Sequence, residues 1–356
     1  MILNASAAKR QRARRLLVAL NWLLALALVV LLGLLLAMFR EPEVKYPPVS
    51  GIQPERVIYG PGVGVEPLFN RPMGAAFGND GQIYVVDSGN NRVVVFDKNG
   101  RYIVQFGGLG VAKPAPGGTY TWGPGRFNYP TDIAIDEDGH LYVADFRNDQ
   151  IQVFDEIGRF LRVFPDRNKK VGKGGSGQGG TGIAATSLCV RGGRVYVTDK
   201  YQVLVFTTDG KLLNQFGKPG MGATDLNHPN GIAVAPSSAV VVSDSNNNRL
   251  VGLSPVGKPL WTLGRPSAFD LSQVVDAFQL PRGLTLANNG NLVVADSLGS
   301  QLIEVSMQGE LLNTFGKRGD APGEFNFPTD VAASGNRLLV TEKGNNRVQV
   351  VTLGAK

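Results

Sequence analysis

Short runs of apolar residues, separated by turn sequences, fill the chain from about residue 55 to its end. Two of them, IYVVD and RVVVF, flank the turn SGNN at residues 88–91. Short apolar runs bounded by Gly, Asn and Asp predict β-strands, whereas helices usually need at least about ten residues. A content of 46 glycines and 21 prolines favours the same conclusion.

The strand pattern recurs along the chain, and the pentapeptide GNNRV at residues 89–93 is repeated unchanged at 344–348. Six copies of the pattern begin at Pro72, Pro130, Ala185, Pro229, Pro281 and Pro328. Each complete copy has four apolar runs, strands a to d, and turns such as NDG and KNG join a to b and c to d, as in β-hairpins. The chain is therefore predicted to be all-β, a six-bladed β-propeller with four-stranded antiparallel blades.

The sixth copy is incomplete, because it stops after strand c at Leu353. The sequence ERVIYG at residues 55–60 has the pattern of strand d and precedes the first copy. We expect it to complete the last blade, since an unpaired edge strand would leave backbone hydrogen-bonding groups open. The propeller would then span residues 55–353, with 354–356 as a tail.

An acidic residue closes strand b in every copy, and an arginine opens strand c in three of them. The acids are Asp87, Asp145, Asp199, Asp244, Asp296 and Glu342, and the arginines are Arg92, Arg249 and Arg347. Asn and Gly tolerate the left-handed backbone of a b–c turn, turn amides can donate to the acid, and the arginine can reach it. We interpret this ring of residues as structural, because acids spread around a circumference do not converge on a metal ion.

The N-terminal part differs from the rest, since residues 16–39 are almost entirely apolar. At a rise of 1.5 Å per residue they would span about 36 Å as a helix, which is enough to cross a bilayer. A single uncleaved transmembrane helix is expected, with a cleaved signal peptide as the alternative. The basic tail 1–15 would be cytosolic and the proline-rich segment 40–54 a linker. The propeller would lie outside, in a bacterial periplasm or at a cell surface.

The basic excess of the chain belongs to its N-terminus. Lys and Arg total 36 against 29 for Asp and Glu, but six of the basic residues and no acid lie in residues 1–40. The predicted propeller is thus almost neutral, which does not favour a nucleic-acid partner. The single cysteine, Cys189, excludes an intrachain disulfide, and its apolar surroundings predict a buried structural thiol.

The copies resemble the NHL repeat, in the pattern V-x-D-x-x-N-x-R-V at residues 85–93 and its relatives across residues 55–353. The third copy departs from it, with a b–c turn DKYQV that is two residues shorter than DSGNNRV and lacks the usual Asn. The resemblance implies a six-bladed propeller that binds a partner more often than it catalyses a reaction. Related amidating lyases hold zinc with several histidines, but this chain has only His140 and His228, expected on opposite faces. No metal site is expected from them.

The elaborated face of the propeller is predicted to bind the partner. Long insertions fall only in the d-to-a crossovers, which share one face with the b–c turns, and functional residues tend to lie on such loops. The candidate residues form an aromatic and basic groove over blades 1–3: Tyr120, Trp122, Phe146, Arg147, Arg167, Lys169, Lys170 and Tyr201. The alternative is that these aromatic residues only pack their own loops against the propeller.

Two functions follow from these features. The first is a membrane-anchored, extracytoplasmic and non-catalytic scaffold that binds a protein, a peptide or a glycan. The alternative is a propeller enzyme, a lactonase-like or strictosidine-synthase-like hydrolase or lyase, with calcium in the axial channel near Asp132 and Asp330. No catalytic residue is assigned, because the sequence has no recognisable nucleophile constellation.

Overall fold

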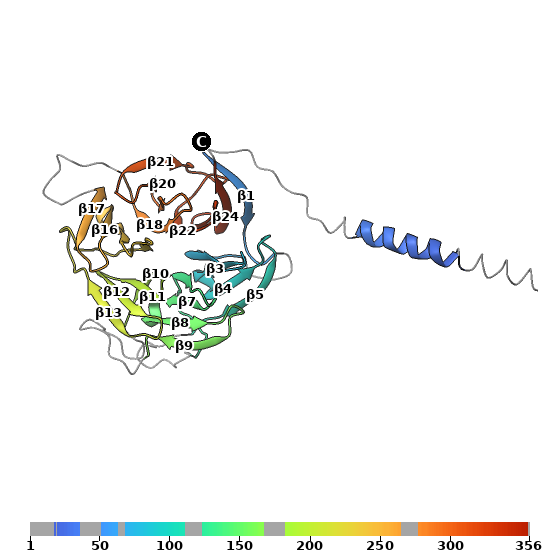
Figure 1. The fold of residues 1–356 in the computed structure, drawn as a ribbon, viewed down its shortest axis with the longest axis horizontal. Helices are drawn as coiled ribbons and strands as arrows, with labels where there is room; N and C mark the ends of the chain where they lie inside the picture. The colour runs from blue at the N-terminus through green and yellow to red at the C-terminus, as the bar shows by residue number, and fades with distance from the viewer. Residues whose placement is uncertain are drawn as a thin grey trace, which may run out of the picture. The chain divides into compact units, whose positions relative to one another are not determined.

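A computed structural model describes residues 18, 20–35, 51–62, 68–110, 123–166, 182–264 and 277–354. The chain divides into two units, Met1–Lys45 and Tyr46–Lys356. In the first unit, residues 20–35 are helical (Figure 1). Among the described residues, no helix combines the length and the apolar character that crossing a membrane requires.

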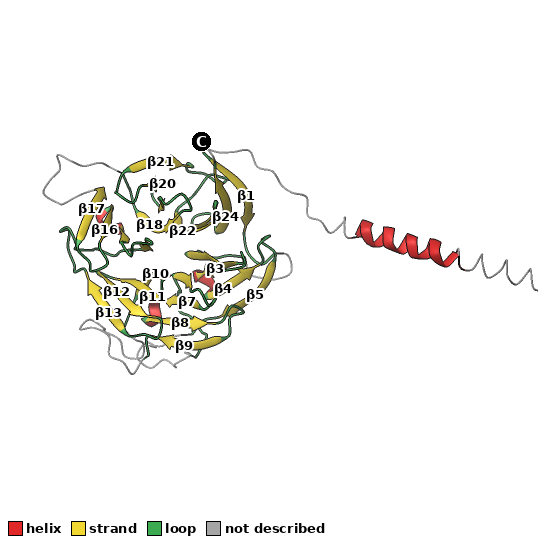
Figure 2. Ribbon diagram, viewed as in Figure 1, coloured by secondary structure: helices red, strands yellow, loops and turns green. Residues whose placement is uncertain are grey.

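The second unit is a ring of six four-stranded antiparallel sheets around a central axis (Figure 1), which confirms the predicted propeller. Figure 2 shows that strands make up nearly all of its regular structure. Three single-turn 3-10 helices, η1 (Ser88–Asn90), η2 (Phe146–Asn148) and η3 (Ser245–Asn247), occupy b–c turns.

The strands follow the order a to d within each blade. Blade 1 contains β2 (Gly74–Phe77), β3 (Ile83–Asp87), β4 (Arg92–Phe96) and β5 (Tyr102–Gly107). Blade 2 contains β6 (Asp132–Ile135), β7 (Leu141–Asp145), β8 (Gln150–Phe154) and β9 (Phe160–Phe164). Blade 3 contains β10 (Ala185–Arg191), β11 (Arg194–Asp199), β12 (Gln202–Thr207) and β13 (Leu212–Phe216). Blade 4 contains β14 (Gly231–Val234), β15 (Val240–Asp244), β16 (Arg249–Leu253) and β17 (Pro259–Gly264). Blade 5 contains β18 (Pro281–Leu286), β19 (Leu292–Asp296), β20 (Gln301–Val305) and β21 (Leu311–Phe315). Blade 6 contains β22 (Pro328–Ser334), β23 (Arg337–Glu342), β24 (Arg347–Leu353) and, as strand d, β1 (Ile52–Ile58).

The ring closes by pairing the start of the propeller with its end, since β1 is the outer strand beside β24 (Figure 1). Arg56 pairs with Val350 and Ile58 with Val348, as the sequence predicted. The strand begins at Ile52, however, so residues 52–54 belong to the sheet and not to the linker. A register shift just after Pro54 accommodates this proline at the edge of the sheet, where its missing N–H costs no ladder hydrogen bond.

Each apolar core cluster is shared by two neighbouring blades. Ile83 and Val94 of blade 1, for example, pack with Leu339 and Val348 of blade 6. Strands b and c are buried along their whole length in most blades, because neighbouring blades cover both of their faces. This double coverage explains why the sequence shows continuous apolar runs there instead of strict alternation. Burial of each valine or leucine stabilises the ring by about 1.5–3 kcal/mol.

Candidate binding face

The b–c turns and the d-to-a crossovers meet on one face of the propeller. In blade 1, the Gly89 N–H donates to the Asn70 carbonyl at 2.8 Å, and the Asn90 side chain donates to the Leu68 carbonyl at 2.9 Å. The a–b and c–d turns lie on the opposite face, and their backbones close within each turn, as in the 2.9 Å bond from Gly100 N–H to the Asp97 carbonyl. Some of their side chains reach the next blade, as Asn79 Nδ2 does in donating to the Glu137 carbonyl at 3.2 Å. We name the two sides the loop face and the turn face.

A buried carboxylate ties each crossover on the loop face to the b–c turn of the same blade. Asp87 accepts the N–H of Asn70 through Oδ1 at 2.7 Å. Through Oδ2 it accepts Asn90 Nδ2 at 2.8 Å and Arg92 Nε at 2.7 Å. The backbone donor therefore belongs to the crossover and not, as expected from the sequence, to the turn. Burial raises the pKa of Asp87, while these donors oppose the shift.

The same arrangement recurs with variations around the ring. Asp244 and Glu342 are bound by Arg249 and Arg347, with Nε donating at 2.8 Å and 2.6 Å. In blade 2 two glutamines replace the arginine, and burial raises the pKa of Asp145 to about 6.

Blades 3 and 5 depart furthest from this arrangement. Asp199 receives a side-chain hydrogen bond from Gln202 at 3.1 Å, across the shortened turn of blade 3. Asp296 accepts the N–H of Leu280 at 2.7 Å and a long bond from Gln301 at 3.4 Å. The predicted ring of acids is thus present in all six blades, but its basic partner varies.

The residues of the pentapeptide GNNRV have different structural roles. Gly89 is required because a Cβ there would lie 2.5 Å from Asn70 Cγ, and not because its backbone is left-handed. The left-handed residue is Asn91, with φ of 53°. Its Oδ1 accepts the N–H of Tyr129 in the next blade at 2.7 Å, so this turn also joins blades 1 and 2. In blade 6, Asn346 does the same for Arg71 at 2.8 Å, across the closure of the ring.

The buried arginines also hold the long crossovers. Arg347 donates to the carbonyls of Asp320, Ala321 and Glu324, the last two at 3.1 Å and 2.8 Å. Arg249 binds the carbonyls of residues 221, 222 and 225 in the same way. The insertions 217–227 and 317–325 are therefore fixed loops, because each is hydrogen-bonded to an arginine side chain, Arg249 or Arg347, that is only 1% exposed.

The predicted groove is only partly within the described residues. Tyr120, Trp122, Arg167, Lys169 and Lys170 lie outside them.

The three groove residues that are described lie on the loop face. Phe146 and Arg147 start η2, and Arg147 is exposed, with Cζ 4.7 Å from the ring centroid of Tyr129. Tyr201 is half-buried, and its ring lies 5.2 Å from that of His228. Within the described part of the chain, no side-chain contact joins the first two to Tyr201.

Sequence reasoning missed a second set of loop-face residues. Each precedes the proline that opens a blade and has a left-handed backbone, with φ of 50–54°: Arg71, Tyr129, His228 and Phe327. Such a backbone is rare for residues other than Gly, Asn and Asp. The four positions are equivalent in the repeat, so aligning the residue before each opening proline could have revealed this aromatic and cationic set.

The axial channel is lined by the six strands a and encloses about 280 Å³. Asp132 and Asp330 stand in its wall at the loop-face end of β6 and β22. Burial and the Asp330 carboxyl raise the pKa of Asp132 to about 8, and burial raises the pKa of Asp330 to about 6. The Asp330 carboxyl thus affects Asp132 although their blades are not adjacent.

These channel carboxylates also link neighbouring blades. Asp132 accepts the N–H of Leu188 in blade 3 at 2.7 Å, and Asp330 accepts that of Ala75 in blade 1 at 3.0 Å. Asp132 also accepts the N–H of Ile133 at 2.8 Å. Three of the four carboxylate oxygens thus accept backbone amides. Calcium takes six to eight oxygen ligands, and the other side chains of the wall are mostly apolar, so these residues do not fit a calcium site.

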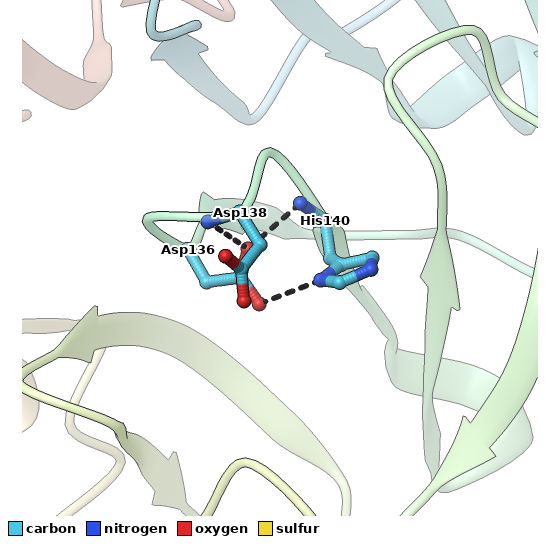
Figure 3. Close-up of side chains that lie close together, drawn as sticks. All are labelled: Asp136, Asp138 and His140. Carbon is cyan, nitrogen blue, oxygen red and sulfur yellow. Dashed lines mark hydrogen bonds and ion pairs between the residues drawn. The ribbon is translucent and has the colours of Figure 1, made fainter.

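Both histidines have partners. His140 lies on the a–b turn between β6 and β7, and His228 lies on a crossover, so they are on opposite faces. Figure 3 shows Asp136, Asp138 and His140 gathered on this one turn, with ligand atoms within 4.8 Å of one another. Asp136 Oδ1 accepts the N–H groups of Asp138 and His140, and Oδ2 lies 3.0 Å from His140 Nδ1. This arrangement caps the turn.

Cys189 lies in the wall of the axial channel and is partly buried. Burial raises the pKa of its thiol to about 11. Since the thiolate is the reactive form, this cysteine is inert at neutral pH.

A family model, the NHL repeat, matches residues 69–96, 127–154, 226–253 and 325–351. The chain contains NHL repeats. The matched residues lie in blades 1, 2, 4 and 6, where the acid accepts two or more strong side-chain hydrogen bonds from the b–c turn and strand c. The blades outside these matches, 3 and 5, are those with the weakest bonds to the acid.

The NHL repeats are shared with proteins of different kinds. Protein brain tumor of Drosophila melanogaster is 27% identical over 180 residues, 48% of this chain and 15% of that protein. NHL repeat-containing protein 3 of Homo sapiens is 27% identical over 187 residues, 47% of this chain and 52% of that protein. The chain thus matches at most about half the length of these two relatives. A gluconolactonase structure from Xanthomonas campestris has a TM-score of 0.54 at 15% identity, covering 88% of this chain and 99% of that one, which shows a common fold.

Proposed function

We propose that the protein is a membrane-anchored, extracytoplasmic scaffold that holds a protein, a peptide or a glycan on its loop face. The supporting observation is the construction of this face. Two of its crossovers, 217–227 and 317–325, are fixed by buried arginines, while Arg147, Tyr129, Tyr201 and His228 stay half-buried or exposed in contacting pairs. Tyrosine and arginine side chains on a rigid support are favoured in binding hot spots, because little conformational entropy is lost on contact.

The same proposal places residues 16–39 in the membrane as a single helix, with residues 1–15 in the cytosol. Its support is the sequence, namely the apolar run and the basic residues that precede it. The chain enters the propeller at the turn face, because Ile52 pairs with Leu353 at the end of β24 away from its b–c turn.

The alternative, a propeller enzyme with a metal ion in the axial channel, has one observation in its favour, the interacting pair Asp132 and Asp330. Against it stand the amide hydrogen bonds that already use three of their four oxygens. A calcium titration followed by thermal melting distinguishes the two functions. A scaffold of this construction should melt at the same temperature with and without calcium, whereas a calcium-dependent rise would favour the enzyme.

Capture experiments with full-length variants test the binding face. Replacement of Trp122 and Tyr201 by Ala should abolish partner capture from detergent-solubilised membranes of the source organism and leave the melting temperature unchanged. The matched control is Ile157→Ala, which truncates a side chain that is 67% exposed on the turn face. Capture that survives the double substitution, or that is lost equally in the control, would reject the loop-face site.

A further inference from the structure

A pocket of about 510 Å³ lies on the loop face where blade 6 meets blade 1. We call it the seam pocket, and its lining residues are Asn70, Arg71, Asn326, Phe327, Lys343, Gly344 and Asn346. Its volume falls within the range of about 300–1,000 Å³ that is usual for small-molecule sites. None of the described groove residues, Phe146, Arg147 and Tyr201, is among its lining residues.

Two cations lie against one aromatic ring at this pocket, and a third cation lines the pocket. Lys343 Nζ lies 5.4 Å and Arg282 Cζ 5.9 Å from the centroid of Phe327, and Arg71 lines the same pocket. Within the described residues, none of the three cations forms an ion pair with a carboxylate. The arginines that bind the acids at the ends of strands b, Arg92, Arg249 and Arg347, differ sharply, because Nε of each lies within 2.8 Å of a carboxylate oxygen. We call these three ion pairs the clamps.

The cluster is electrostatically unfavourable as it stands. Burial and the nearby charges of Arg282 and Arg71 lower the pKa of Lys343. Burial also lowers the pKa of Arg282, and its Nε is buried without a hydrogen-bond partner in the described structure. An unpaired buried donor and repelling like charges both cost free energy unless an anion is bound among them.

The remaining lining suits the rest of a ligand. The side-chain amide of Asn70 has no hydrogen-bond partner among the described residues, so it can donate to an oxygen atom. Phe327 offers an aromatic wall, and the Asn346 side chain already holds Arg71 in place through its backbone N–H at 2.8 Å. Positive charge, a free amide and an apolar wall therefore occur together.

We propose that the seam pocket binds an oxyanion, the carboxylate or phosphate group of a small ligand, between Arg71 and Lys343. Both side chains donate hydrogen bonds and carry a positive charge, which is the chemistry that recognises such groups. Arg282 adds to the positive potential. Since Arg71 belongs to blade 1 and Lys343 to blade 6, a bound oxyanion would also brace the closure of the ring.

The test is calorimetric titration of the full chain, in non-ionic detergent and a chloride buffer, with inorganic phosphate and separately with succinate. The wild type should bind at least one of the two at a single site and melt at a higher temperature in its presence. Lys343→Gln and Arg71→Asn should each weaken this binding at least tenfold. Asn is chosen for position 71 because it tolerates the left-handed backbone found there, with φ of 51°.

The matched control is Lys200→Gln, which removes one positive charge from an exposed residue of the same face but outside the pocket. It should change the affinity less than twofold. An equal loss in Lys200→Gln and Lys343→Gln would mean a diffuse electrostatic effect and would overturn the pocket, as would the absence of binding to both probes. A short single-stranded RNA serves as a third probe. If it binds and succinate and phosphate do not compete with it, the loop face is a polyanion surface and the proposal is wrong.

Discussion

The turns on one face of this propeller are short and close through their own backbone hydrogen bonds, whereas two long loops on the other face are held by buried arginines. On the turn face, Asp155 receives Arg159 Nε at 3.0 Å, and the side chain of Arg159 is 76% exposed. On the loop face, Glu342 receives Arg347 Nε at 2.6 Å, and both side chains are at most 1% exposed. An arginine and a carboxylate thus form a surface ion pair on one side and a buried clamp on the other, where the arginine also holds loop carbonyls.

The difference explains how the loop face carries long crossovers without losing order. A clamp arginine satisfies several loop carbonyls at once, so the loop needs no regular structure of its own. Cations that are not used in clamps, such as Lys343 and Arg71, then remain available for a ligand. The turn face has short turns and offers no comparable support for an irregular surface.

Removal of a clamp should have the largest effect. Arg347→Met leaves the Glu342 carboxylate buried without its cation and frees three loop carbonyls, so we expect a loss of about 3–5 kcal/mol of unfolding free energy. Arg159→Met on the turn face should cost about 0–1 kcal/mol, because an exposed pair gains little. Urea unfolding of both variants measures the contrast, and equal losses would show that the two faces are held alike.

The channel residue Asp132 should contribute to the pH dependence of stability. The pKa of Asp132 is raised to about 8 in the folded state, so its stabilising contribution is complete below pH 4 and is lost as the pH rises through 8. One such group changes the unfolding free energy by at most about 1.4 kcal/mol per pH unit.

The Asp132→Asn variant isolates this effect. Its unfolding free energy should fall less steeply than that of the wild type between pH 5 and pH 8, whatever its stability at any single pH. Parallel curves for the two proteins would show that Asp132 is ionised throughout the range. A matched replacement of the turn-face residue Asp97 by Asn supplies the control.

A smaller effect is expected from the glycine of the repeated pentapeptide. Gly89→Ala forces a Cβ to within 2.5 Å of Asn70, and we expect a loss of about 1–3 kcal/mol from this overpacking. Gly123→Ala is the control on the same face, because the closest atom to its added Cβ is 3.9 Å away. Thermal melting of both variants measures the difference in stability. A Gly89→Ala variant with the melting temperature of the wild type would mean that the crossover at Asn70 can move away from the added Cβ.

Much of the fold was predictable because its strands and turns depend on sequence patterns of a few neighbouring residues. Apolar runs bounded by turn residues predicted the strands, and their repetition predicted six blades. The pattern of ERVIYG predicted which segment completes the last blade, since strand d has the same form elsewhere. The strand bounds failed at residues 52–54, where a proline-rich composition resembled a linker but the edge position tolerates Pro54.

The candidate site was harder to predict, because its contacts join distant residues. The bond from the Arg71 N–H to Asn346 spans 275 residues, and no local pattern announces it. The donor to each acid likewise comes from a crossover about seventeen residues upstream, as with Asn70 and Asp87, and not from the neighbouring turn. The net charge also gave no indication that Arg71, Arg282 and Lys343 lie close together, because the propeller as a whole is nearly neutral.

The central claim is that the loop face holds the partner, and blocking each face in turn tests it most directly. In a Cys189→Ser background, Lys200→Cys on the loop face and Arg159→Cys on the turn face each provide one exposed thiol for a bulky maleimide–polyethylene glycol. Modification at position 200 should abolish partner capture, and modification at position 159 should leave it intact. Capture that survives the first and is lost with the second would contradict the account.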